Sequence, residues 1–209
     1  MNRPTAEPEK RPYHHGDLKT ALLREAELIL ERDGLQALTL RAVSRAAGVS
    51  HAAPNNHFGD LTGLLSELAA VGFNRFGTAL GKAMDAAGED PRERMTAMGL
   101  AYVGFARKHP GLFALMFRSE RLDDAHPPLR AAINDARQAL RAAASARAPA
   151  SPLSPLQLVA QAAALWSLVH GFAMLLLEGR LEGMIKSLPS GEDADSLLAA
   201  VLATARVGD

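Results

Sequence analysis

Apolar residues recur at spacings of three and four along most of the 209-residue chain, which is the pattern of amphipathic helices. The clearest case is the first predicted helix, whose apolar face carries Leu18, Leu22, Ala26, Ile29 and Leu30. No stretch sustains the period-two alternation of β-branched and aromatic residues that predicts strands. The pattern therefore predicts an all-α fold, and counting the periodic segments gives about nine helices.

Capping residues predict the ends of the first three helices. Asp17 is the expected N-cap of the first helix, and Gly34 is expected to end it in a left-handed conformation. Thr39 and Ser50 are the expected N-caps of the second and third helices. Pro54 falls in the first turn of the third helix, where its missing N–H costs least. The three helices are expected over residues 17–33, 40–47 and 51–57.

Prolines and loop-forming residues separate the later helices. These are expected over residues 60–87, 91–108, 110–117, 129–146, 155–179 and 193–206. The helix over 155–179 is apolar nearly all round, so it must be covered by its own bundle and by a second subunit. Pairing it with the last helix would give a four-helix interface across a two-fold axis. We therefore expect a homodimer that forms through these two helices.

The composition is that of a soluble globular protein, with 48% hydrophobic and 22% charged residues. Cysteine is absent, which excludes disulfides and thiolate sites and fits a reducing compartment. Residues 1–13 lack the apolar core of a signal peptide. Polar residues interrupt the apolar stretch over 159–177, which is interpreted as a buried helix rather than a membrane span. These observations predict a cytoplasmic protein without a membrane partner.

Charge is distributed unevenly although its sum is zero. Residues 35–59 carry Arg41 and Arg45 and no carboxylate, whereas several acids precede this segment and Asp60 follows it. Such a locally positive strip suits a compact unit that contacts a duplex, although many DNA-binding proteins are basic overall. We interpret Arg45 as a surface charge or a member of an ion pair.

The tripeptide Gly48-Val49-Ser50 lies between the second and third predicted helices, which is typical of the turn in a helix-turn-helix unit. The second helix of such a unit enters the major groove of DNA. Its expected exposed side chains are short, so the backbone can approach the base edges: Ser50, His51, Ala52, Asn55 and Asn56. Asparagine can pair with adenine and alanine can contact a thymine methyl group. A purely structural helical hairpin is the alternative.

Four groups of residues around this turn resemble the TetR family of repressors. They are Leu38–Val43, Ala46–Ser50, His57–Asp60 and the pair Leu64-Leu65. The resemblance implies an all-helical dimer that binds double-stranded operator DNA. It also implies three parts: a flexible N-terminal arm over 1–16, a helix-turn-helix domain over 17–59, and a ligand-binding and dimerisation domain over 60–209.

The same resemblance implies roles for individual residues. Thr39 and Arg41 would contact phosphates at the start of the second helix, and Ser50, His51, Ala52 and Asn56 would face bases or the flanking backbone. Phe58 would anchor the third helix on the core, and His57 would reach a phosphate. The chain departs from the family pattern twice. Asn55 and Asn56 replace the usual aromatic residues, and Leu61 replaces a lysine, which weakens the expected phosphate contacts.

The leader from Arg11 to Leu18 looks like one branch of the TetR family. Tyr13 and His14 would then lie along the DNA backbone or enter the minor groove, as basic arms do. The adjacent residues His14 and His15 could suggest a metal site instead. No cysteine or clustered acid supports that reading, so we expect no metal site and no cofactor.

Two further segments resemble the same branch, and the second resembles a tryptophan-histidine-glycine signature: His109–Phe117 and Trp166–Phe172. They bring large apolar groups and one polar side chain into an alanine-rich region. Small-molecule pockets are mostly apolar with a few placed polar groups. The candidate ligand-binding residues are therefore Phe113, Met116, Phe117, Trp166 and His170. Ordinary core packing is the alternative for each of them.

The sequence favours a transcriptional regulator, with repression as the expected mode, whose affinity for DNA is changed by an apolar or amphipathic effector. A second hypothesis is a helical small-molecule-binding protein whose N-terminal part no longer binds DNA. A third is an all-helical enzyme, but no nucleophile-histidine-acid arrangement, phosphate-binding loop or metal-binding spacing supports catalysis. We expect no catalytic residues.

Overall fold

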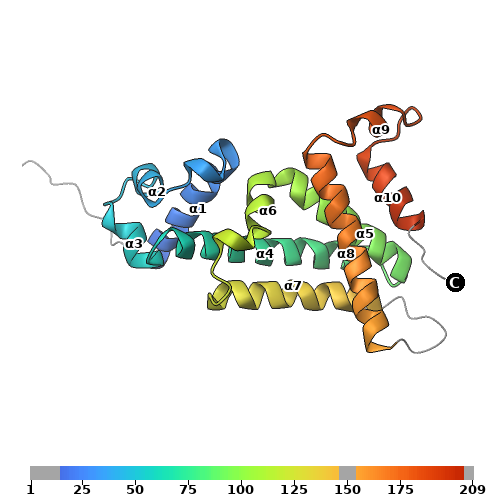
Figure 1. Ribbon diagram of the computed structural model, residues 1–209, viewed down its shortest axis with the longest axis horizontal. Helices are drawn as coiled ribbons and strands as arrows, with labels where there is room; N and C mark the ends of the chain where they lie inside the picture. Colours follow the sequence, from blue (N-terminus) through green and yellow to red (C-terminus); the bar gives the residue numbers. More distant parts are fainter. Residues whose placement is uncertain (1–14, 146–153, 205–209) are drawn as a thin grey trace, which may run out of the picture.

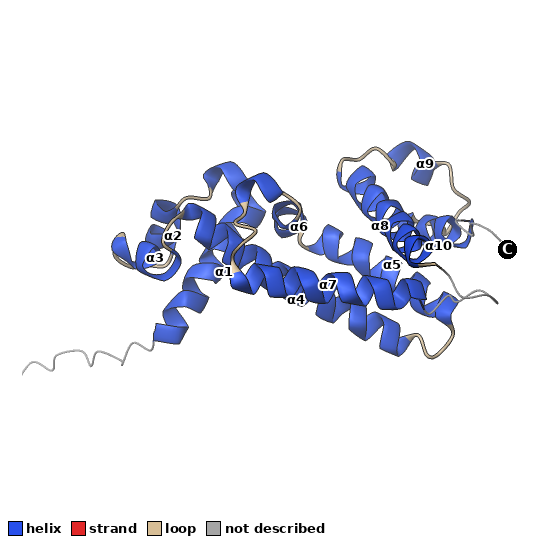
Figure 2. Cartoon of the chain, turned by 60° about the horizontal axis from the view of Figure 1, so that its bottom comes forward, coloured by secondary structure: helices blue, strands red, loops and turns tan. Residues whose placement is uncertain are grey.

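The computed structural model describes residues 15–145 and 154–204 of the chain. These residues form ten α-helices and two 3₁₀ helices and contain no strand, which confirms the all-α prediction (Figure 2). The elements are α1 (His15–Asp33), η1 (Leu35–Ala37), α2 (Leu40–Ala46), α3 (Ala52–Phe58), α4 (Leu61–Ala86), α5 (Pro91–Lys108), α6 (Pro110–Met116), η2 (Ser119–Arg121), α7 (Pro127–Ser145), α8 (Pro155–Leu177), α9 (Glu182–Lys186) and α10 (Ala194–Thr204).

The helices are arranged around α4, which runs along the long axis of the molecule (Figure 1). Helices α1–α3 form one end, where α1 and α3 both contact α4. Helices α5, α6 and α7 pack along the rest of α4. Helix α8 crosses α5 and α7 near the other end, and α10 packs on α5. Helix α4 therefore belongs both to the N-terminal three-helix unit and to the larger bundle.

Several predicted helix ends are corrected by the structure. Helix α1 begins at His15, so Asp17 lies within its first turn and is not its N-cap. Ser50 is not the N-cap of α3 either: His51 takes that position and makes no side-chain capping bond. The carbonyl of Ser50 instead accepts the N–H of Ala53, at 3.0 Å, so a backbone bond in the turn replaces the expected side-chain cap. Helix α9 was not predicted, because it is a short turn between two longer helices.

The junction between α3 and α4 is tight. Gly59 ends α3 with a φ of 78°, a conformation that favours glycine. The Asp60 side chain then caps α4 by accepting the N–H of Gly63 at 2.8 Å. A Cβ atom added to Gly63 would overlap the carbonyl oxygen of Phe58. The position of α3 relative to α4 therefore depends on the missing side chain at residue 63.

Helix α8 is exposed over most of its surface in the single chain. Among the described residues it is the one helix long and apolar enough to cross a membrane, yet only 22% of its apolar window is buried. Leu156 and Val159 are 78% and 58% exposed. Within one chain, α5 and α7 cover only one side of α8, so the predicted burial is incomplete without a partner. Its coverage by a second subunit stays a prediction.

Candidate functional site

Helices α2 and α3 form a helix-turn-helix at the end of the molecule. Thr39 caps α2 as predicted, because its side chain accepts the N–H of Ala42 at 3.1 Å. Gly48 turns the chain after α2 with a φ of 67°. Ala53, Pro54 and Phe58 form the buried side of α3, and Phe58 belongs to the core as the sequence indicated.

The opposite side of α3 is open to solvent. Its exposed side chains form a surface that we name the recognition surface: Ser50, His51, Ala52, Asn55 and Asn56. His57 is half-buried next to Phe58. Neither asparagine turns inward toward the core, so the short side chains are free to approach another molecule.

His51 is held in place by Ser44, which the sequence analysis did not single out. Ser44 is fully buried, and its hydroxyl donates to the carbonyl of Arg41 at 3.0 Å. The same oxygen lies 3.1 Å from Nδ1 of His51. Because the hydroxyl has only one hydrogen, Nδ1 must carry the proton that joins these two atoms. A buried serine seven residues earlier in the chain gives no sequence signal for this contact.

The positive strip has no compensating acid among the described residues. Arg41 and Arg45 are both exposed, and neither makes an ion pair within residues 15–145 and 154–204. The ion pair considered for Arg45 is therefore not formed with any described residue. Leu61 is half-buried and packs against the core, so it contributes apolar contact where a lysine was expected. Tyr13 and His14 lie outside the described residues.

A second candidate site lies in the bundle, where aromatic side chains of four helices meet. We name it the aromatic cluster: Phe73, Phe76, Tyr102, Phe105, Phe113, Phe117, Trp166 and His170. The ring centroid of His170 lies 4.6 Å from that of Phe117 and 5.6 Å from that of Phe113. The ring of Trp166 lies 5.9 Å from that of His170. Four of the five predicted ligand-binding residues are thus in contact.

Met116, the fifth, is buried on another side of α6. A Cβ atom added to Gly72 of α4 would lie 2.8 Å from the sulfur of Met116. Met116 therefore fills the space between α6 and α4, and its role in ligand binding stays a prediction.

Tyr102 is a member of the cluster that the sequence analysis missed. Its hydroxyl lies 2.9 Å from Nδ1 of His170, and Nε1 of Trp166 donates to it at 3.2 Å. Burial raises the pKa of Tyr102 well above its ordinary range, and the smaller effect of the Trp166 bond opposes this. Burial also lowers the pKa of His170. Both groups are therefore neutral near pH 7. A tyrosine 68 residues from its histidine carries no sequence signal for this pair.

Comparison with known families decides the class of the protein. Residues 95–205 match the tetracyclin repressor-like C-terminal domain, which is more than half of the chain. The chain belongs to the TetR family. Members of this family are transcriptional regulators that bind DNA, and they are not enzymes. The sequence-based predictions of the family, the fold class and the regulator function are confirmed.

Solved structures agree with the TetR assignment. A protein with unknown function from Rhodococcus sp. RHA1 is 35% identical, with a TM-score of 0.77, over 93% of this chain and 96% of its own. The TetR family regulator PfmR from Thermus thermophilus is 20% identical, with a TM-score of 0.56, over 87% of this chain and 94% of its own. RolR in complex with resorcinol is 18% identical, with a TM-score of 0.58, over 91% of this chain and 88% of its own. No curated protein matches the sequence.

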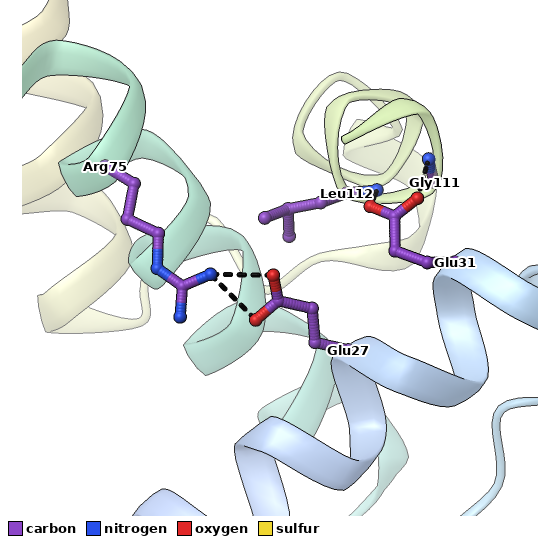
Figure 3. Close-up of polar contacts among 5 residues, drawn as sticks. All are labelled: Glu27, Glu31, Arg75, Gly111 and Leu112. Carbon is purple, nitrogen blue, oxygen red and sulfur yellow. Dashed lines mark hydrogen bonds and ion pairs between the residues drawn. The ribbon is translucent and has the colours of Figure 1, made fainter. Parts of the chain in front are cut away.

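In this TetR family member, α1 is joined directly to α6. The carboxylate of Glu31 accepts the N–H of Gly111 and the N–H of Leu112, both at 2.9 Å (Figure 3). A Cβ atom added to Gly111 would lie 2.9 Å from the carbonyl oxygen of Leu30, so the two helices are in close contact. We name these contacts the α1–α6 link. Phe113 follows immediately on α6, so the link lies beside the aromatic cluster.

One turn earlier, α1 is joined to α4 instead. Glu27 accepts two bonds from Arg75, at 2.6 and 2.8 Å (Figure 3). Lys19 of α1 pairs with Glu67 of α4 at 2.7 Å. Helix α1 thus contacts two different helices of the bundle through separate carboxylates.

Proposed function

We propose that the protein is a cytoplasmic homodimeric repressor that binds operator DNA through α2 and α3. Residues 17–59 form the DNA-binding domain and residues 60–209 form the domain for ligand binding and dimerisation. A small apolar or amphipathic effector binds at the aromatic cluster and lowers the affinity for the operator. The exposed recognition surface carries this proposal, together with Arg41 and Arg45, which have no ion-pair partner in the part of the chain that the structure describes.

Each part of the surface has a chemical role in the proposal. Asn55 and Asn56 have amide groups that can pair with base edges, and Ala52 is small enough to contact a thymine methyl group. Arg41 and the exposed hydroxyl of Thr39 lie at the start of α2, where they contact phosphates. Two such units in a dimer contact half-sites about 34–36 Å apart or a multiple of that spacing.

Selection of duplexes from a random pool tests DNA binding. The wild-type protein is expected to enrich one sequence, and the selected duplex then serves to measure affinity against salt concentration. Asn56→Ala is expected to cost about 1–3 kcal/mol per half-site on the selected duplex and little on random DNA. Arg41→Gln is expected to weaken binding to the selected duplex and to random DNA alike. The slope of log affinity against log salt concentration is expected to become shallower by roughly 0.9 for each phosphate that the protein no longer neutralises.

The same measurement separates the alternative. A helical ligand-binding protein with a degenerate N-terminal part would enrich no sequence and show a flat salt response. The packing of Leu61 on the core, where a phosphate-binding lysine was expected, is the observation that favours this alternative.

The exposed face of α8 supports the proposed dimer. Exposing most of the apolar side chains of a helix to water is unfavourable. In a dimer with a two-fold axis, this face of α8 in one subunit packs against the same face of the other subunit and is buried. Helix α10 lies next to the same region, on α5, and its apolar residues Leu197 and Val201 are only partly buried. The two helices together form the proposed interface.

Val159→Glu is expected to produce a monomer, because it places a charge on the exposed face of α8. Operator affinity then falls by two orders of magnitude or more, since the second half-site no longer adds binding energy. Sedimentation equilibrium measures the mass, and a shift assay on the selected duplex measures the affinity. Leu28→Glu is the matched control, because Leu28 is 51% exposed on α1. A dimeric Val159→Glu variant with full affinity would exclude this interface.

The α1–α6 link supports the proposed response to an effector. Helix α6 carries Phe113 in the aromatic cluster, and its first N–H groups are bound by Glu31 of the DNA-binding domain. A ligand that repositions α6 therefore changes the position of α1. The effector favours a conformation in which the two recognition surfaces no longer match the operator, and its effect equals its difference in affinity for the two states.

A further inference from the structure

The aromatic residues of this chain are concentrated at one place. The whole sequence has seven Phe, two Tyr and one Trp. The aromatic cluster contains five of the Phe, one Tyr and the Trp, together with His170. Ordinary helical cores are built mainly from aliphatic side chains, and the rest of this core is. The cluster is therefore an aromatic region within a mainly aliphatic core, and aromatic faces favour flat aromatic partners.

We infer that the effector is a neutral aromatic molecule with a hydrogen-bond acceptor such as a carbonyl oxygen, which Nε2–H of His170 binds. This inference rests on the proposed function, since it names the chemistry of the effector at the aromatic cluster.

The hydrogen bonds around Tyr102 determine which nitrogen of His170 carries the proton. An indole N–H can only donate, so Trp166 donates to the oxygen of Tyr102. The hydroxyl of Tyr102 then has its own hydrogen to place, and Nδ1 of His170 is its acceptor at 2.9 Å. If Nδ1 carried the proton instead, the buried hydroxyl hydrogen would lose its partner, which is costly. The favoured tautomer of His170 therefore has its proton on Nε2.

Nε2 of His170 is available to a ligand. It makes no hydrogen bond within the part of the chain that the structure describes, and it is not among the fully enclosed polar atoms there. The histidine is half-buried, Phe117 is half-buried and Trp166 is 43% exposed, whereas Phe113 is 0% exposed. In the single chain the site is thus open at Trp166 and Phe117. Because Trp166 lies two turns after Val159, on the face of α8 proposed for the dimer, the ligand is expected to enter from the side of Phe117, where an aromatic ring can pack.

The surroundings favour a neutral ligand. Burial lowers the pKa of His170, so the ring does not supply a positive charge near pH 7. The other members of the cluster are apolar except Tyr102, whose phenol stays protonated because its pKa is raised. Arg118, which follows Phe117, is exposed and lies 3.8 Å from Glu120. A charged ligand at His170 would therefore lose its hydration without gaining an opposite charge from the cluster.

Four small probes of similar size separate the features of the ligand. Acetophenone has both the ring and the acceptor, cyclohexyl methyl ketone lacks the aromatic ring, ethylbenzene lacks the acceptor, and benzoate is charged. Trp166 is the only tryptophan of the chain, so its fluorescence reports binding at the site. Acetophenone is expected to bind about two- to tenfold more tightly than ethylbenzene, which is the range of one neutral hydrogen bond. It is also expected to bind more tightly than the other two probes.

Variants test the role of the histidine. His170→Phe keeps a ring of similar size and is expected to bind acetophenone and ethylbenzene equally. His109→Phe is the matched control, because the ring of His109 packs on Phe105 at 4.9 Å, and it is expected to keep the preference. Nitrogen-15 NMR of the wild-type protein gives the tautomer directly and does not depend on a variant folding.

Three results would overturn the inference: a proton on Nδ1 of His170, equal binding of acetophenone and cyclohexyl methyl ketone, or no binding of any probe. Each leaves the proposed function intact, because enrichment of an operator is measured without a ligand. Failure to enrich any duplex would remove the proposed function, while a ring- and acceptor-specific ligand site would stand.

Discussion

Gly63→Ala is expected to abolish specific operator binding while the bundle stays folded. The added Cβ atom would overlap the carbonyl oxygen of Phe58, so α3 must move away from α4. The recognition surface moves with α3, and affinity for the selected duplex falls toward the non-specific level, roughly 10³-fold or more. Overpacking of this kind also costs about 1–3 kcal/mol of stability. A shift assay measures the first effect and thermal unfolding the second.

Two other glycines of α4 provide matched controls. Gly77 and Gly81 lie in the same helix, and a Cβ atom added to either would meet nothing within 4 Å. Gly77→Ala and Gly81→Ala are expected to keep full operator affinity and to gain up to about 1 kcal/mol each, because alanine is the better helix former. If Gly63→Ala bound the duplex like these controls, the junction would not determine the position of α3.

Glu31→Gln is expected to leave operator binding nearly unchanged and to remove most of its response to an effector. A glutamine presents one oxygen and one NH₂ group, so it cannot accept both N–H groups of α6 as the two carboxylate oxygens do. At least one of the two bonds is then lost, so α6 is held to α1 less firmly and its movement is transmitted to α1 less well. An effector typically changes affinity at a coupled site by about 5- to 150-fold. In this variant the ratio of operator affinities without and with the effector is expected to approach one. It is measured as operator affinity with and without acetophenone.

The neighbouring pair on α1 supplies the control for this variant. Glu27→Gln removes an ion pair to α4 whose Arg75 side chain is 50% exposed, so it costs at most about 1 kcal/mol. It leaves the α1–α6 link intact, and the response to acetophenone is expected to persist. Equal loss in both variants would mean that α1 as a whole, rather than its contact with α6, carries the response.

Much of the fold could be predicted because local chemistry determines it. Pro91 begins α5 and Pro155 begins α8, since proline fits the first turn of a helix. Thr39 caps α2 and Asp60 caps α4, where the side chains meet free N–H groups. The prediction that Ser50 caps α3 was wrong for a physical reason. A helix can begin without a side-chain cap when the backbone of the preceding turn accepts one of its first N–H groups.

The candidate sites were predictable only in part. The exposed side of α3 was expected because α3 is the second helix of a helix-turn-helix, and Asn55 and Asn56 are exposed as expected. The contacts that position the other groups join residues distant in the sequence. Tyr102 meets His170 across two helices, and Glu31 meets Gly111 across 80 residues. The need for glycine at residue 63 also depends on the packing of α3 on α4, which no local pattern records.

The exposed apolar face of α8 also affects how the stability of the protein depends on its concentration. A lone chain holds Leu156 and Val159 in water, so any association that covers them adds to the free energy of folding. The melting temperature is then expected to climb with protein concentration rather than stay fixed. If the proposed dimer forms, newly made chains at low copy number are expected to spend longer as monomers, in a form open to proteolysis, so the lifetime of the protein would depend on its abundance.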